Sequence, residues 1–321
     1  MIKIKYLICV TAALLVAQNA LAQNWPTRPV RVIVPYAAGG NTDYTARTVS
    51  AKLTEMWGQQ INVDNRPGGG TNIGSELAAK AAPDGYTLFM GGASNAVNMT
   101  LYAKPPYNTL RDFTPVIWCV QGAALLAAHP SLPAKNLKEL IALAKARPGQ
   151  LNYGHAGLGS SNHMAGELLN VMAGINIVHV PYKGNTPSIT DAIAGNVELV
   201  MSGVPALVPH LKSGRLRGIA ISSLERFPAV PDVPTFDESG IKGYEASNWF
   251  GLMAPIKVPK EIIAKINADA NKVLSSSEVR GKFSTSGLIT KGGSPEEFDK
   301  WIRAEILKYE NVIRKARLKP L

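Results

Sequence analysis

The sequence predicts an α/β protein made of two similar domains. Strand-like and helix-like runs alternate over residues 30–90, and the same alternation returns over residues 151–222. A β-α-β order is typical of a parallel sheet with helices on its faces, whose ligands gather at the carboxyl ends of the strands. The chain has 321 residues and shows no repeat of solenoid length, so two domains are favoured over an array of small units.

The first series begins with a clear strand-to-helix unit. A strand is expected over 30–36, the loop "AAGGNTD" follows it, and an amphipathic helix then runs to Trp57 with Asn41 or Thr42 as its N-cap. The other elements expected in this series are a strand over 61–64, a helix near 73–82 and a strand over 86–90.

The second series follows the same plan. Its expected elements are a strand over 151–156, the loop "GLGSSN", a helix over 163–172, a strand over 177–182, a helix over 188–194, and strands over 199–201 and 217–222.

Two apolar segments are expected to cross between the domains, namely residues 116–129 and the strand near Ile219. The tail carries a capping box, Ser294-Pro295-Glu296-Glu297, which predicts a last helix that returns to the first domain. The sequence therefore divides into a first domain of residues 23–122 and 224–321 and a second domain of residues 123–223.

The N-terminus has the pattern of a secretory signal peptide. Lys3 and Lys5 precede an apolar run over 6–16, and Ala20-Leu21-Ala22 supplies the small residues that a signal peptidase recognises. The run is shorter than the roughly 20 apolar residues that a membrane span needs. We therefore expect residues 1–22 to be removed by cleavage before Gln23.

Composition narrows the class of partner. The formal net charge is +11, and removal of Lys3 and Lys5 leaves +9 (11 − 2), which favours anionic partners. Nucleic acid is a poor candidate because the basic residues are scattered and form no recognised motif. Cys9 would leave with the signal peptide, so the remaining Cys119 can form no intramolecular disulfide and is expected to be a small buried hydrophobe.

The loop "AAGGNTD" is a candidate anion site. Its glycines let the backbone approach a ligand, and the free N–H groups of the following helical turn attract negative charge. The loop lacks the Lys and Ser/Thr of a P-loop and the third glycine of a dinucleotide fingerprint. A plain turn, with Asp43 complementing the helix dipole, is the alternative.

A counterpart, "GHAGLGSSNHMA", stands at the same point of the second series. Gly157 and Gly159 free the backbone there, while Ser160, Ser161 and Asn162 offer polar groups at another helix N-terminus. If the two domains face one another, two anion-binding helix ends meet across a cleft. A small carboxylate would fit, with domain closure as the motion.

Evidence for catalysis is weaker. The five histidines show no metal-binding spacing, and the serines show no G-x-S-x-G motif. We therefore expect no catalytic residues, no metal and no cofactor. A triad of Ser160 or Ser161 with His163 and an aspartate stays open as an alternative.

Seven motifs in order resemble one family. They are "VPYAAGGNTDYTAR", "VDNRPGGGTNIG", "AAPDGYTLFMGG", "LNYGHAGLGSSNHMAGE", "HVPYKGNTPSITDAIAGNVELVM", "SGRLRGIAISSLERFPAVPDVPTFDESG" and "WFGLMAPIKVP". The mature chain resembles the Bug-type periplasmic solute receptors of tripartite tricarboxylate transporters over nearly its whole length. The resemblance implies a type II periplasmic binding protein fold, two α/β domains that close on a small organic acid, and residence in the periplasm. We expect a monomer.

The resemblance also implies the ligand-binding residues. They are Tyr36, Ala38, Gly39, Gly40, Thr42 and Asp43 in the first loop, Gly157, Gly159, Ser160 and Ser161 in the second, Tyr182 and Gly184 in "VPYKG", and Ser94 and Asn95 after the third strand. Two roles stay open: Lys183 either meets a carboxylate or faces solvent, and Asp43 either caps its helix or meets the ligand.

Three functions therefore compete. The first is a receptor that delivers its ligand to membrane transporter subunits. The second is an exported α/β hydrolytic enzyme with a serine in the cleft, which would turn its ligand over. The third is a ligand sensor for a membrane signalling partner, which shares the binding chemistry of the receptor and differs only in the surface it presents.

Overall fold

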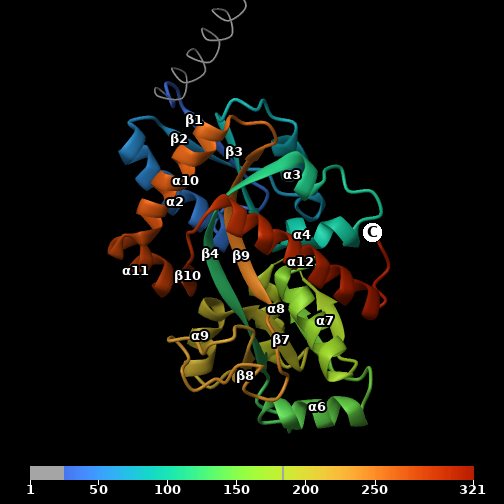
Figure 1. Cartoon of the computed structure of the whole chain (residues 1–321). Coiled ribbons are helices and arrows are strands. Elements are labelled where there is room, and N and C mark those ends of the chain that lie inside the picture. The colour runs from blue at the N-terminus through green and yellow to red at the C-terminus, as the bar shows by residue number, and fades with distance from the viewer. Residues whose placement is uncertain (1–24, 183) are drawn as a thin grey trace, which may run out of the picture.

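A computed structural model of the protein describes residues 25–182 and 184–321 (Figure 1). The predicted signal peptide and Lys183 lie outside the described residues. The elements follow in the order β1 (Val30–Val34), α2 (Asn41–Trp57), β2 (Ile61–Asn65), η1 (Gly69–Thr71), α3 (Asn72–Ala79), β3 (Thr87–Gly92), α4 (Ala93–Leu101), α5 (Thr109–Asp112), β4 (Phe113–Ala128), α6 (Leu137–Ala146), β5 (Asn152–His155), α7 (Ser161–Ala173), β6 (Val178–Pro181), α8 (Asn185–Ala194), β7 (Leu199–Gly203), α9 (Val204–Lys212), β8 (Arg217–Ile221), β9 (Ser247–Pro255), α10 (Lys260–Ser275), α11 (Ser277–Thr285), β10 (Leu288–Thr290) and α12 (Pro295–Lys315).

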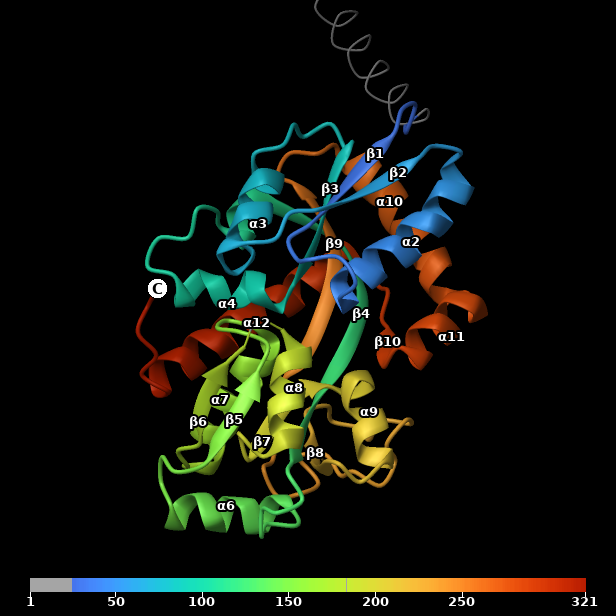
Figure 2. The ribbon, with the colours of Figure 1, turned by 180° about the vertical axis from the view of Figure 1, so that it is seen from behind.

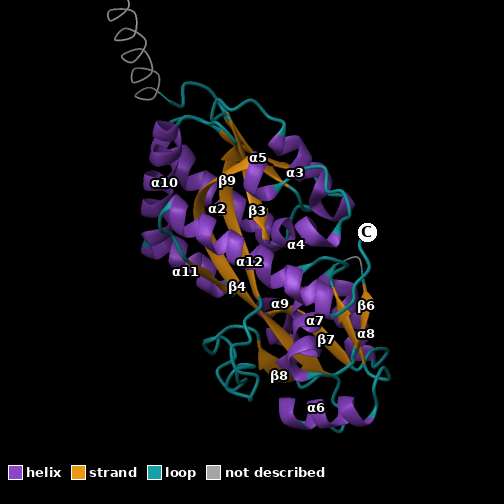
Figure 3. Ribbon diagram, turned by 45° about the vertical axis from the view of Figure 1, so that its right-hand side comes forward, coloured by secondary structure: helices purple, strands orange, loops and turns teal. Residues whose placement is uncertain are grey.

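The strands form two α/β lobes that share one long strand. In the first lobe β1 pairs in parallel with β2 and β3, and β9 runs antiparallel between β3 and β4. In the second lobe β5 pairs in parallel with β6 and β7, and β4 runs antiparallel to β7 and β8. Helices cover both faces of these sheets (Figure 3). The predicted pair of parallel-sheet series is confirmed.

The first predicted crossing is confirmed. Strand β4 pairs with β9 up to Ala123 and with β7 from Ala124 onward, so it passes from one sheet into the other. Figure 1 shows β4 and β9 running side by side between the upper and lower lobes.

The second predicted crossing is wrong. Ile219 lies in β8, which pairs with β4 inside the second sheet, and the chain returns to the first sheet through β9. Ile219 and Ile221 are buried. An apolar strand is compatible both with the interior of one sheet and with a crossing between two sheets, so the sequence did not distinguish them.

The division into domains stays a prediction, and we propose one change to it. The segment 224–246 forms backbone hydrogen bonds with β8, which belongs to the second sheet. Ile221 donates its N–H to the Pro234 carbonyl, and Phe236 donates to the Ile221 carbonyl. The second boundary would then lie near residue 246 instead of 223.

The N-termini of α12 and α2 differ in how they are capped. Helix α12 begins at the predicted capping box: the Ser294 hydroxyl accepts from the Glu297 N–H, and the Glu297 carboxylate accepts from the Ser294 N–H. Helix α2 begins at Asn41, so its N-cap is Gly40 and not Asn41 or Thr42 as predicted. Glycine has no side chain, so no hydroxyl or carboxylate occupies the first N–H groups of α2.

Besides β4 and β9, the last helix connects the two lobes by packing. Helix α12 packs against α4 and β4 of the first lobe and also against α7 of the second. Cys119 is fully buried, and burial raises the pKa of its thiol to about 12, which fits an unreactive core residue. Across residues 25–182 and 184–321, no helix combines the length and apolar character that a membrane crossing requires.

Candidate functional site

The carboxyl ends of parallel strands from both lobes point toward the region between them. Strands β1, β3, β5, β6 and β7 each lead through a loop or turn into a helix, namely α2, α4, α7, α8 and α9. Seen from behind, the loop between β1 and α2 faces the lobe that contains α8 and α9 (Figure 2). One contact spans the lobes there: Ser94 Oγ lies 3.4 Å from the Gly159 carbonyl oxygen. Gly203 of the second lobe also lies close to Asn41 of the first, since a Cβ added to it would lie 4.0 Å from Asn41 Nδ2.

Asp43 organises the first loop. Its side chain is almost fully buried and accepts hydrogen bonds from the Gly39 N–H at 2.9 Å and from Arg47 Nε at 3.0 Å. Burial alone would raise the pKa of Asp43, but the hydrogen bonds from Arg47 and Gly39 outweigh it and hold the pKa below its usual range. In the described structure these bonds go to Gly39, which precedes α2, and to the Arg47 side chain, and not to the first N–H groups of the helix. The two open roles of Asp43, capping and ligand contact, therefore both stay predictions.

The rest of the first loop is available from solvent. Ala38, Gly39 and Gly40 are exposed, and Gly39 needs its freedom because its φ is +87°. Thr42 is buried in the first turn of α2. The N–H groups of this turn have no intrahelical acceptor, and Gly40 cannot cap them. They are therefore the candidate anion-binding groups of this loop.

Tyr36 and Ser94 join the first loop to the second. Tyr36 is half-buried beside Ser94, and its carbonyl accepts from Asn65 Nδ2 at 3.1 Å. Burial raises the pKa of Tyr36 to about 12, so the phenol stays neutral. Ser94 is buried in the first turn of α4 and donates to the Gly159 carbonyl.

Asn95 is occupied elsewhere. Its Nδ2 group lies 2.9 Å from both Ser75 Oγ and the Tyr107 hydroxyl, and its Oδ1 accepts from the Gly92 N–H at 2.9 Å. Both amide hydrogens are thus engaged inside the first lobe. A ligand contact through Asn95 stays a prediction that these bonds do not support.

In the second loop, two imidazoles lie against the backbone of the glycines. The Gly157 N–H lies 3.2 Å from His155 Nδ1, and the Gly159 N–H donates to His163 Nδ1 at 3.2 Å. The Ser160 hydroxyl is the N-cap of α7 and accepts from the His163 N–H. Ser161 opens the helix, so its N–H and that of Asn162 are the donors that remain.

The segment after β6 supports the second loop. The Tyr182 ring covers Gly154, and its hydroxyl donates to Asp191 at 2.7 Å. Burial and the Asp191 carboxylate raise the pKa of Tyr182 to about 12. Gly184, with φ of +118°, is the N-cap of α8 and donates its N–H to the Ala156 carbonyl.

Sequence reasoning missed a group of three histidines. His155, His163 and His179 come from β5, α7 and β6, and their nearest ring nitrogens all lie within 4.8 Å of one another. Burial and the neighbouring imidazoles lower the pKa of His155 to about 4 and that of His163 to about 2. Their spacing along the chain matches no motif, but His155 at a strand end and His163 in a first helical turn are positions that sequence could have flagged.

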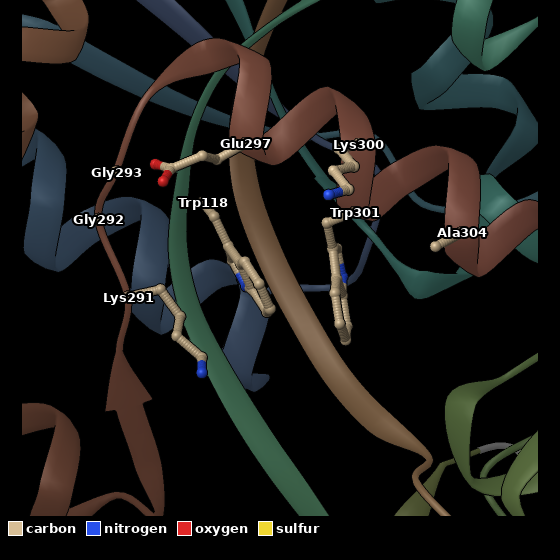
Figure 4. Close-up of a pocket in the computed structure, with 8 residues that line it drawn as sticks. All are labelled: Trp118, Lys291, Gly292, Gly293, Glu297, Lys300, Trp301 and Ala304. Atoms are coloured by element: carbon tan, nitrogen blue, oxygen red, sulfur yellow. The ribbon is translucent and has the colours of Figure 1, made fainter.

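A hollow of ≈ 540 Å³ is lined by none of the predicted site residues (Figure 4). It lies between β4, the loop after β10, and α12. Trp118 and Trp301 stack there with ring centroids 4.3 Å apart, and Lys291 Nζ is 5.0 Å from the Trp118 ring. Its wide aromatic wall sets it apart from the helix N-termini of the two loops.

The comparisons with known proteins agree with this architecture. The family model described as "Tripartite tricarboxylate transporter family receptor" matches residues 45–318. Protein BugT of Bordetella pertussis is 36% identical over 306 residues, which cover 95% of this chain and 94% of BugT. Rpa4515 of R. palustris, solved with adipate, is 38% identical with a TM-score of 0.83 and covers 92% of this chain and 100% of its own. MatC from Rhodopseudomonas palustris, solved with bound malate, is 33% identical with a TM-score of 0.79, over 90% of this chain and 100% of its own.

Fold and site together define a two-lobed solute-binding protein of the periplasmic type. The chain belongs to the tripartite tricarboxylate transporter receptor family, the Bug-type receptors. The predicted fold class is confirmed, and the family is one of periplasmic solute-binding receptors.

Proposed function

We propose that the protein captures a small organic anion with at least one carboxylate between its lobes and delivers it, in the periplasm, to a tripartite tricarboxylate-type membrane transporter. The observation that carries this proposal is the pair of uncapped or partly capped helix starts, α2 and α7, one from each lobe. A helix N-terminus stabilises a negative charge by about 0.3 to 2 kcal/mol, depending on burial.

A dicarboxylate suits two such helix starts best. One carboxylate would accept from the first N–H groups of α2, and the other from those of Ser161 and Asn162 in α7. The related receptors solved with adipate and with malate support this class of ligand. Ala38, Gly39, Gly40, Thr42, Ser94 and Tyr182 would shape the space around the ligand body.

The hydrolase alternative has less support. The Ser160 hydroxyl caps α7 through the backbone N–H of His163, not through its ring, and Ser94 donates to a carbonyl. His163 Nδ1 is already taken by Gly159. His163 Nε2 has no hydrogen-bond partner in the described structure, so neither Ser160 nor Ser161 is paired with this imidazole as a base, which nucleophilic catalysis by serine requires. A sensor role shares the binding chemistry and differs only in its partner.

A thermal-shift screen tests the ligand class. Adipate, malate and longer or aromatic dicarboxylates are compared with neutral sugars and with cationic amines of equal size. A ligand that binds only the folded state adds RT ln(1 + [L]/Kd), about 2.7 kcal/mol at 100 times Kd. We expect carboxylates alone to raise the melting temperature. A shift with sugars or amines, and none with carboxylates, would contradict the anion assignment of both loops.

Compartment and delivery need separate tests. N-terminal sequencing of exported protein should begin at Gln23, whereas an intact Met1 end in the membrane fraction would refute cleavage. For delivery, deletion of the gene should abolish uptake of the identified carboxylate. Uptake that persists without the receptor would point to the sensor role.

A further inference from the structure

His155, His163 and the half-buried His179 lie together behind the second loop, and we call them the histidine group. The rings of His155 and His163 stack with centroids 4.6 Å apart, and the His179 ring meets His163 edge-on at 4.6 Å. His155 and His163 are almost fully buried. The group therefore contacts the loop from the protein interior.

The hydrogen bond at His163 decides where its proton lies. The Gly159 backbone N–H can only donate, so His163 Nδ1 must present a lone pair. The neutral ring then carries its proton on Nε2, and this nitrogen is buried and has no hydrogen-bond partner in the described structure. An imidazolium would direct a second N–H at Gly159 and break the contact.

His155 has two consistent arrangements instead of one. Its Nδ1 lies 3.2 Å from the Gly157 nitrogen and 3.0 Å from the Gly157 oxygen, while its Nε2 lies 3.4 Å from His179 Nδ1. A proton on either nitrogen of His155 satisfies one Gly157 group and is matched at His179. His155 can adapt, whereas His163 cannot.

We propose that His163, as a neutral imidazole protonated on Nε2, is a positioning residue for the second anion-binding loop. By accepting from Gly159 it holds the loop in its left-handed turn and withdraws that N–H from the ligand. The N–H groups of Ser161 and Asn162 are then the ones that meet a carboxylate. This inference rests on the proposed function for its ligand, but its tautomer and its contact with Gly159 can be tested without one.

Metal binding is the competing use of the same residues, since three neutral imidazoles are common ligands of zinc. Ligation through His163 Nε2 requires a lone pair on Nε2 and hence a proton on Nδ1. That proton would oppose the Gly159 N–H. Ligation through His163 Nδ1 would instead use the lone pair that accepts from Gly159. A metal bound through either nitrogen would therefore break the observed contact with Gly159.

Matched variants separate hydrogen bonding from packing. In His163→Asn the amide oxygen takes the place of Nδ1 and can still accept from Gly159, whereas His163→Leu fills the space without an acceptor. His129→Leu is the control, because the His129 side chain forms hydrogen bonds only with Ser131 in the described structure. With adipate or malate as the probe, we expect His163→Leu to raise Kd at least tenfold and His163→Asn to stay within about threefold of wild type.

Two ligand-free measurements complete the test. Nitrogen-15 NMR of the imidazoles should show the Nε2–H tautomer at His163, and amide exchange at Gly159 should be slow in wild type and His163→Asn but fast in His163→Leu. If wild type binds neither acid, the dicarboxylate proposal fails while these two readouts still judge His163. A proton on Nδ1, equal Gly159 exchange in both variants, or tight binding of Zn²⁺ alone that moves the His163 proton to Nδ1 would overturn the inference.

Discussion

At the scale of single residues, a carboxylate stabilises the first loop and an imidazole stabilises the second. Asp43 accepts the Gly39 N–H in the first loop, and His163 accepts the Gly159 N–H in the second. In both loops a glycine with positive φ gives its N–H to the protein instead of to a ligand. The donors that we propose for the ligand are consequently the helix starts that follow, not these two glycines.

Loss of the Asp43 carboxylate should destabilise the first loop. Asp43→Ala removes the buried acceptor of Gly39 and Arg47, and we expect the free energy of unfolding to fall by about 1 to 3 kcal/mol. Asp43→Asn keeps an acceptor and should lose less. Urea denaturation measures both. Asp299→Ala is the control, because Asp299 and Arg303 form the same i,i+4 pair on an exposed face and should contribute under about 0.5 kcal/mol. Equal losses at Asp43 and Asp299 would contradict this account.

The histidine group should make stability depend on pH. Burial lowers the pKa of His155 to about 4 and that of His163 to about 2, below the ordinary value of 6.5. Below pH 6.5 a histidine in the unfolded chain binds a proton, whereas the buried ring in the folded protein stays neutral. The free energy of unfolding therefore falls as pH drops below 6.5 and changes little above pH 6.5. At pH 5 each ring should cost about 2 kcal/mol relative to pH 7.

The measurement compares urea unfolding of wild type and of His163→Asn at pH 7 and pH 5. The variant should lose less stability over this interval. Glu167, whose pKa burial raises, acts in the opposite direction in both proteins, so the difference between them reports His163. Parallel pH profiles would show that His163 does not stay neutral in the fold.

At the scale of elements, the N-terminus of α2 is the most exposed part of the proposed site. Its N-cap is Gly40, whose φ of −83° suits any residue, and a Cβ there would contact only the Ala37 carbonyl at 3.9 Å. Nothing in the backbone demands glycine at this position. Its missing side chain leaves the helix start open to an anion.

Gly40→Asp tests this use of α2. An aspartate at the N-cap accepts from the first helical N–H groups, so the ligand-free protein should gain a few tenths of a kcal/mol or more. The same carboxylate would occupy the site, so adipate or malate binding should weaken at least tenfold. Calorimetry and thermal melts give both quantities, and Gly40→Ala, which adds bulk without an acceptor, is the control. Unchanged affinity in Gly40→Asp would remove α2 from the site.

At the scale of the whole molecule, the loops belong to lobes joined by β4 and β9. Ligand bound to both loops should therefore draw the lobes together. Small-angle scattering should show a smaller radius of gyration when adipate or malate saturates the protein. Gly40→Asp at the same ligand concentration should show no change. An unchanged radius in saturated wild type would count against closure, though not against binding.

The sequence by itself determined the features that depend on nearby residues. The two β-α series, the capping box at Ser294, the crossing by β4 and the positions of both glycine loops follow from periodicity, turn chemistry and motif order. These predictions hold because a helix start or a strand is specified by a window of several neighbouring residues. The family followed from seven such segments in order.

Only the tertiary structure decided how those segments use their polar groups. Ile219 could belong to a crossing or to the interior of one sheet, since apolar strands look alike, and pairing with β4 settled the choice. His155, His163 and His179 gather because β5 and β6 pair and α7 packs on them, a contact that no spacing encodes. Asn95, Gly39 and Gly159 were predicted to bind the ligand, yet the side-chain amide of Asn95 and the backbone N–H groups of these two glycines donate to other protein groups. Hydrogen-bond capacity is shared across the whole fold, so the donors left for a ligand can be identified only after every buried partner is in place.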